Sequence, residues 1–172
     1  MAYAEESRKK RRDVKSHKLF FVHKGRNDQK GRKIPILDIM NRKQILEALL
    51  HHKLVAIVRL KQQDQVAEVL ENLVAGGVQV LEITSNTPGF AEEIKIARKR
   101  YPEILIGAGT ITTTDLALTA IKFGAQFLVT PNTNPEIVKL AHLYNIPVLM
   151  GATTPTEIAV SVEAGADIVK LF

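Results

Sequence analysis

The chain has 172 residues, contains no cysteine and carries a formal net charge of +6. The absence of cysteine excludes disulfides and thiol chemistry, and no apolar run approaches the roughly 18 residues that cross a bilayer. Hydrophobic residues make up 45% of the chain and charged residues 24%, which is typical of a globular protein. The first residues also lack the apolar segment of a secretory signal. We therefore expect a cytoplasmic protein without a membrane partner.

The positive charge is concentrated at the N-terminus. Residues 1–39 hold twelve lysines and arginines against five acidic residues, whereas residues 40–172 hold twelve against thirteen. The N-terminal stretch shows no helical periodicity, so we predict a basic, disordered extension over 1–39 and the folded domain over 40–172. We do not expect nucleic acid as a partner, although a nucleic-acid-binding arm is the alternative explanation of this charge.

From residue 41 onward, helical and strand patterns alternate with short connections. Amphipathic periodicity, closing glycines and helix-starting Thr, Asp or Pro residues predict helices over 41–52, 62–77, 90–102, 112–124, 135–145 and 155–165. Short apolar runs predict strands over 54–59, 78–84, 105–110, 127–130, 147–151 and 167–172.

The strands are apolar throughout, as expected of a parallel sheet covered by helices. Three junctions, AGGVQVLEIT, FGAQFLVTP and AGADIVKLF, repeat the order helix, glycine, buried strand. Such stacked βα units form either a doubly wound sheet or a (β/α)₈ barrel. No GxGxxG or P-loop motif follows the first strand, and polar residues recur at the strand ends, where a barrel has its active site. We predict an α/β fold of the (β/α)₈ TIM-barrel class, represented by about its first six βα units.

Lys170 lies in an apolar strand, between Val169 and Leu171. Burial disfavours a charged ammonium group, and a neutral amine forms a Schiff base with a carbonyl compound. The alternative is a lysine whose side chain extends past the strand end to solvent.

Glu82 is the second polar residue in an apolar strand, and alternation places it on the same face as Val80 and Thr84. A buried carboxylate could transfer protons near neutral pH. The alternative is a structural ion pair with Lys170 or Arg59.

Three further groups are weaker candidates. Arg59, at the end of VAIVR, could bind a substrate carboxylate or simply be exposed. The motif IGAGT, which ends at Thr110, could let a ligand approach the backbone or serve packing alone. Pro131 shapes the loop after its strand. The five histidines show no metal-ligand spacing, and we predict no metal.

The ordered set VAIVR, AGGVQVLEIT, IGAGTI, GAQFLVTP, TPTE and AGADIVKLF resembles the class I aldolases that cleave 2-keto-3-deoxy-6-phosphogluconate (KDPG) or 4-hydroxy-2-oxoglutarate (KHG). The resemblance spans about residues 41–172. It implies a (β/α)₈ barrel, usually a homotrimer, without metal or organic cofactor. Its implied activity is cleavage of a 2-keto acid to pyruvate and an aldehyde, either glyceraldehyde 3-phosphate or glyoxylate.

The resemblance also implies roles for five residues. Lys170 is expected to form the Schiff base and Glu82 to act as general acid and base. Arg59 and Thr110 are expected to hold the substrate, and Pro131 to line the pocket.

The sequence departs from the family pattern in three places. Asn86 stands where many members have arginine, and Met150 precedes Gly151 where many have proline and glycine. The family also continues past the lysine strand through two βα units that bind the substrate phosphate. We therefore expect this chain to be a fragment of an aldolase, poorly active by itself, and the choice among gluconate-, galactonate- and hydroxyoxoglutarate-derived substrates stays open.

Two other functions remain open. One is a non-catalytic truncated barrel whose basic arm binds nucleic acid. The other is a different phosphate-binding TIM-barrel enzyme, an isomerase or a synthase, although neither would need the combination of Glu82 and Lys170.

Overall fold

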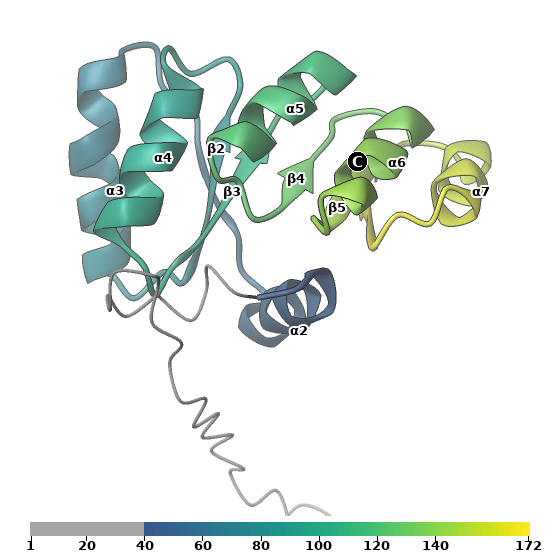
Figure 1. Cartoon of the computed structure of the whole chain (residues 1–172), viewed down its shortest axis with the longest axis horizontal. Coiled ribbons are helices and arrows are strands. Elements are labelled where there is room, and N and C mark those ends of the chain that lie inside the picture. Colours follow the sequence, from purple (N-terminus) through teal and green to yellow (C-terminus); the bar gives the residue numbers. More distant parts are fainter. Residues whose placement is uncertain (1–39) are drawn as a thin grey trace, which may run out of the picture.

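A computed structural model describes residues 40–172; the predicted N-terminal extension lies outside the described residues. Helices and strands alternate along this part of the chain (Figure 1). The helices are α2 (Arg42–His52), α3 (Val66–Ala75), α4 (Phe90–Arg100), α5 (Thr114–Lys122), α6 (Pro135–Leu143) and α7 (Pro155–Glu163), with a short 3₁₀ turn, η2 (Gln63–Gln65), before α3. The strands are β1 (Ala56–Val58), β2 (Val80–Thr84), β3 (Leu105–Gly109), β4 (Leu128–Val129), β5 (Val148–Ala152) and β6 (Ile168–Leu171).

The helix boundaries follow from capping residues that the sequence provides. The side chains of Asn41 and Thr154 each complete a capping box, and those of Thr113 and Asn134 accept hydrogen bonds from the first turns of α5 and α6. Pro135 and Pro155 occupy the first helical positions, where a missing N–H has no cost. The predicted alternation of helix and strand is therefore confirmed.

The six strands form one parallel sheet in the order β1-β2-β3-β4-β5-β6. Sequential order is the order of a barrel wall, whereas a doubly wound sheet reverses direction at a switch point. The prediction of a barrel with about six βα units is confirmed, and the barrel is incomplete in this chain.

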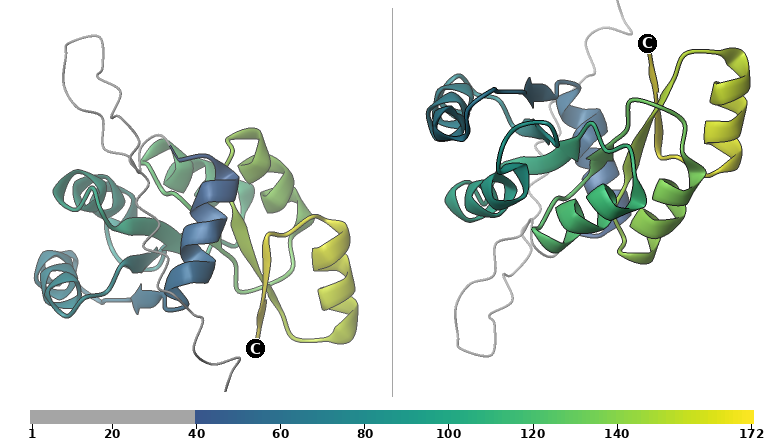
Figure 2. Two further views of the ribbon diagram at one scale, coloured as in Figure 1. Left: turned by 90° about the horizontal axis from the view of Figure 1, so that it is seen from below. Right: turned by 90° about the horizontal axis from the view of Figure 1, so that it is seen from above.

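The two faces of the sheet have separate cores. Helices α3–α7 cover the outer face, where Leu81, Ile83, Ile106 and Met150 are buried. Helix α2 lies on the other face (Figure 2), which corresponds to the inside of a barrel. Its buried residues Ile45 and Leu49 belong to a second cluster with Val80, Leu105, Phe127, Val129 and Leu149. Because most of these strand residues lie toward the amino ends of their strands, α2 covers that end and leaves the carboxyl ends free.

The prediction that 167–172 forms a buried strand is wrong in one respect. Strands β2 to β5 are buried throughout, but β6 is half-buried, and Leu171 and Phe172 are 68% and 63% exposed. In β1, Ile57 is 51% exposed. Both are edge strands, with a neighbour on one side only, so sequence hydrophobicity overestimates their burial.

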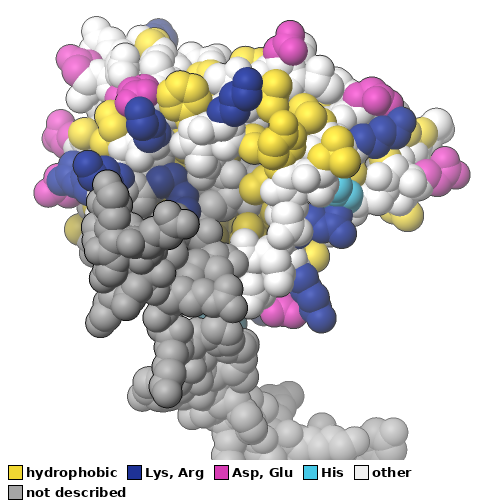
Figure 3. Space-filling model, in the orientation of Figure 1, with side chains coloured by type: hydrophobic (Ala, Val, Ile, Leu, Met, Phe, Trp, Pro, Cys, Tyr) yellow, Lys and Arg dark blue, Asp and Glu magenta, His cyan; other side chains and the backbone are white. Residues whose placement is uncertain are grey.

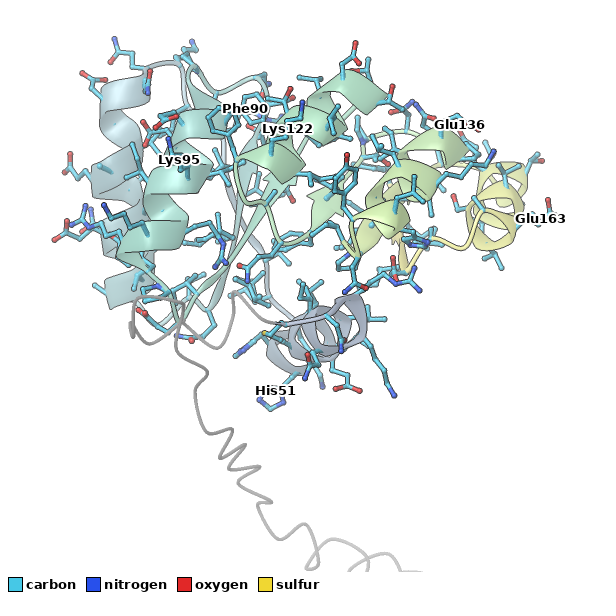
Figure 4. All side chains as sticks on the ribbon, viewed as in Figure 1. His51, Phe90, Lys95, Lys122, Glu136 and Glu163 are labelled. Carbon is cyan, nitrogen blue, oxygen red and sulfur yellow. The ribbon has the colours of Figure 1, made fainter. Side chains whose placement is uncertain are left out.

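The outer helices carry the charged surface. Lys95, Lys122, Glu136 and Glu163 point away from the sheet (Figure 4), and basic and acidic side chains are interspersed on the face shown in Figure 3. No helix in residues 40–172 is long and apolar enough to cross a membrane.

Candidate active site

Four of the five predicted site residues lie at or beyond the carboxyl ends of the strands, and Glu82 lies in the middle of its strand. Arg59 directly follows β1, Glu82 lies in β2, Thr110 directly follows β3, Pro131 follows β4 and Lys170 lies in β6. This is the end that α2 leaves free, and the end at which TIM-barrel enzymes place their active sites.

Strand alternation assigns the three charged residues to one face. Val55, Val80 and Ile168 belong to the inner cluster, and Arg59, Glu82 and Lys170 are each an even number of positions away along the same strand segments. Alternation therefore places Arg59, Glu82 and Lys170 on the inner side of the sheet.

Glu82 is 3% exposed, and burial raises the pKa of its carboxyl group. The positive charges of Lys170 and Arg59 oppose this and lower the pKa by less. Among the described residues, no ion pair within 4.0 Å joins Glu82 to either of them. A structural ion pair therefore does not account for the buried carboxylate.

The glycines of IGAGT make room for neighbouring side chains. A Cβ atom at Gly109 would collide with the Glu82 carboxylate, and one at Gly107 would collide with the ring of Phe127. Packing within the protein is thus sufficient to explain this motif, and Gly109 is what allows Glu82 to lie across β3.

Arg59 and Thr110 are joined directly. The Arg59 guanidinium donates a hydrogen bond from Nη2 to Thr110 Oγ1 over 3.1 Å. This bond spans from the end of β1 to the end of β3, with β2 between them in the sheet. Thr110 has a φ of 56°, a left-handed conformation that is strained for a β-branched residue. Strain of this kind is concentrated at functional sites. The remaining N–H groups of the guanidinium fork are suited to a carboxylate.

Lys170 is half-buried on the edge strand, and its Nζ lies 4.9 Å from the centroid of the Phe172 ring. A cation at this distance from an aromatic face is attracted by the ring. In the sheet, Lys170 pairs with Gly151. The lysine is therefore neither enclosed by the core nor fully in solvent.

Pro131 is exposed in the loop after β4, and its backbone packs against Gly151. Because Gly151 pairs with Lys170, Pro131 lies beside the strand pair that carries the lysine. Asn86, at the position of the first departure from the family pattern, is exposed in the turn after β2.

Sequence reasoning missed the hydroxyl groups of that turn. Thr84 and Thr87 are fully buried, and Ser85 donates a hydrogen bond from Oγ to the Thr110 carbonyl oxygen over 2.7 Å. The signal was the run TSNT directly after the strand of Glu82, since hydroxyl residues at a strand end often bond neighbouring backbone.

The arrangement combines an accessible amine, a buried carboxyl group and an arginine–threonine pair on one face. An amine adds to a ketone carbonyl, a carboxyl group of raised pKa moves protons, and an arginine binds an acid group. Within residues 40–172, no three His, Asp or Glu side chains are grouped so as to hold a metal ion.

Comparison with known proteins identifies relatives of this chain. The family model described as KDPG and KHG aldolase matches residues 45–172. The 2-dehydro-3-deoxy-phosphogluconate aldolase of Haemophilus influenzae is 36% identical over 129 residues, which are 75% of this chain and 61% of that protein. The 2-dehydro-3-deoxy-6-phosphogalactonate aldolase of Escherichia coli (strain K12) is 32% identical over 69% of this chain and 58% of its own length.

One similar solved structure contains bound pyruvate. The KDPG aldolase of Legionella pneumophila, with pyruvate captured at low pH as a covalent carbinolamine intermediate, has a TM-score of 0.64 and 25% identity. That comparison covers 73% of this chain and 60% of the other. This chain thus spans about 61% of the length of the H. influenzae relative. From the matched family model and these relatives, the chain belongs to the KDPG and KHG aldolase family.

Proposed function

We propose that this protein is a class I aldolase that cleaves KDPG or a related 2-keto acid to pyruvate and an aldehyde. One observation carries the proposal: the amine of Lys170 shares a face with the buried carboxyl of Glu82 and is near enough for its charge to lower the pKa of that carboxyl. Schiff-base chemistry requires an amine and a group beside it that transfers protons. The carbinolamine of the Legionella relative is an intermediate of the same kind.

In the proposed reaction, Lys170 Nζ adds to the keto carbonyl, and the oxygen leaves as water after taking up two protons. The resulting iminium accepts the electron pair of the C3–C4 bond as that bond breaks. The C4 hydroxyl gives up its proton and becomes the aldehyde carbonyl. The enamine is then protonated at C3, and water hydrolyses the imine to release pyruvate and the free amine.

Glu82 is proposed to carry the protons in these steps. Removal of the C4 hydroxyl proton requires a base and protonation of C3 requires an acid, and one carboxyl group serves both in succession. Burial raises the pKa of Glu82, so its protonated and ionised forms are closer in population near neutral pH.

Arg59 and Thr110 are proposed to hold the substrate carboxylate, and Pro131 to line the pocket beside Lys170. The Arg59–Thr110 hydrogen bond supports this role because it orients the guanidinium before substrate arrives. The iminium nitrogen is the electron sink, so the proposed reaction uses no metal or organic cofactor.

We propose only that the substrate is a 2-keto acid, because the candidate substrates share the pyruvyl half of the molecule. Relatives of this chain include enzymes named for both phosphogluconate- and phosphogalactonate-derived acids. We also propose that the protein acts in the cytoplasm and as a homotrimer. Light scattering on the purified protein tests the trimer, and a mass other than three copies would contradict it.

Borohydride trapping tests the proposed function directly. The protein is incubated with pyruvate and sodium borohydride, and peptides are mapped by mass spectrometry. We expect a reduced adduct on Lys170 that Lys170→Met abolishes. Lys139→Met is the matched control, because Lys139 is an exposed lysine of α6 paired with Glu136. A pyruvate adduct that persists in a folded Lys170→Met variant would disprove the role of Lys170.

A further inference from the structure

The turn at the end of β2, residues 84–87, contains two buried hydroxyl side chains. The turn is closed by a hydrogen bond from the Thr87 N–H to the Thr84 carbonyl over 2.9 Å. Thr84 and Thr87 are 0% and 1% exposed, although they lie at the open end of the sheet. A buried hydroxyl group needs hydrogen-bond partners. The partners of the hydroxyl groups in this turn show which backbone segments the turn holds in place.

On one side, the turn holds the backbone on both sides of Arg59. Thr84 Oγ1 donates to the Val58 carbonyl over 3.2 Å, and the Leu60 N–H donates to Thr87 Oγ1 over 3.2 Å. The two hydroxyls are themselves 3.2 Å apart. The last β1–β2 pair in the sheet is that of Val58, so the hydroxyls continue the connection where the ladder ends.

On the other side, the turn holds Thr110. The Ser85 N–H donates to the Gly109 carbonyl over 2.8 Å, and Ser85 Oγ donates to the Thr110 carbonyl over 2.7 Å. Thr110 has the strained left-handed conformation described above, which persists only if its surroundings fix it. The two bonds from Ser85 fix the peptide groups on both sides of the Thr110 α-carbon.

The same turn therefore fixes both ends of the Arg59–Thr110 hydrogen bond, which spans from β1 to β3. Arg59 lies beyond the three residues of an edge strand and is exposed, so its own strand gives it little support. We propose that the 84–87 turn is the positioning element of the carboxylate-binding pair, with Thr87 placing Arg59 and Ser85 placing Thr110. This inference rests on the proposed function, because it assumes that the pair binds the carboxylate of a keto acid.

Thr87 and Ser85 are positioning residues and need not contact the substrate. Their loss should weaken binding of carbonyl compounds that carry a carboxylate, and leave those that lack one unaffected. A general loss of structure would weaken both. Pyruvate and acetone form this pair of probes, since both present a methyl ketone to Lys170 and only pyruvate carries a carboxylate.

The test measures the concentration dependence of borohydride trapping on Lys170 for both probes. Thr87→Val removes the hydroxyl at nearly constant shape, Thr87→Ser retains it, and Thr119→Val is the same substitution in the outer helix α5. We expect Thr87→Val to weaken apparent pyruvate affinity about tenfold, as the loss of buried hydrogen bonds would, with acetone trapping within about twofold. Thr87→Ser should stay within about threefold of the unsubstituted protein.

Ser85→Ala provides an independent second variant, because Ser85 is only partly buried, and it should show the same pyruvate-specific loss. The inference is overturned if both variants leave pyruvate affinity unchanged, or if pyruvate and acetone weaken equally. It is also overturned, together with the proposed function, if the unsubstituted protein traps neither probe on Lys170. These results are distinguishable because only the last concerns the unsubstituted protein.

Discussion

An added methyl group at Gly151 would collide with the backbone of the loop after β4. Its ideal Cβ would lie 2.6 Å from the Pro131 carbonyl carbon, 2.6 Å from the Pro131 oxygen and 2.6 Å from the Thr130 oxygen. Each distance is about 0.8 Å short of ordinary contact at 3.4 Å, and all three atoms are backbone atoms that no rotamer change can move. Gly151→Ala must therefore push β5 away from the loop after β4.

The magnitude follows from the cost of overpacking. Forcing extra carbon into a packed interior costs about 1–3 kcal/mol. In a chain of this size each kcal/mol lowers the melting temperature by roughly 2–4 °C. Because Gly151 pairs with Lys170, the displacement should also move the amine relative to Glu82 and reduce pyruvate trapping.

Gly76→Ala is the matched control. Gly76 follows α3 with a φ of −75°, and an added Cβ would meet its nearest atoms at an ordinary 3.4 Å. That substitution should leave stability unchanged or raise it by about 0.4–1 kcal/mol, since alanine restricts the unfolded chain. Urea unfolding of both variants gives the comparison. Equal stability of the two would refute the packing of Gly151 against Pro131 described above.

Two further substitutions test the electrostatics. Glu82→Gln should increase the free energy of unfolding at pH 8 and lose this advantage near pH 4. Burial raises the pKa of Glu82, so the unsubstituted protein loses stability as pH rises through the interval between its unfolded and folded pKa values. Urea titrations at both pH values check this, and an advantage of the same size at pH 4 would contradict it. Asp167→Asn should lower the free energy of unfolding by about 1–3 kcal/mol in the same assay. The largely buried Asp167 carboxylate accepts hydrogen bonds from the Val148 N–H over 2.9 Å and from His142 Nε2 over 3.0 Å. A change below about 0.5 kcal/mol, typical of surface sites, would contradict this expectation.

The sequence was sufficient to predict the fold because local signals agree with one another. Helices α2, α5, α6 and α7 each begin at a residue whose side chain caps them, and most strands are short apolar runs bounded by glycine, proline or polar residues. Agreement between local preference and tertiary structure is what makes such a pattern predictable. The absence of a GxGxxG or P-loop motif and the polar residues at the strand ends then favoured a barrel over a doubly wound sheet, and the strand order confirmed the barrel.

Candidate site residues could be identified from the sequence where a charged residue interrupts an apolar strand, as Glu82 and Lys170 do. Alternation shows which residues share a face, and the inner cluster of the structure shows that this face is the inner one. Ser85 and Thr87 gave no comparable conflict, since hydroxyl residues in a turn are common. Their importance depends on which backbone groups lie beside them in neighbouring strands.

The sequence by itself determined the element order, the barrel class and the candidates for amine and carboxyl chemistry, because these depend on neighbours within one segment. Only the tertiary structure decided that β1 and β6 are half-exposed edges and that Glu82 lies buried without an ion pair in the described chain. It also showed that one turn hydrogen-bonds the backbone on both sides of Arg59 and the Thr110 carbonyl. These facts depend on contacts between segments distant in sequence. Burial and hydrogen bonding are properties of such contacts, and local sequence carries no record of which segments will meet.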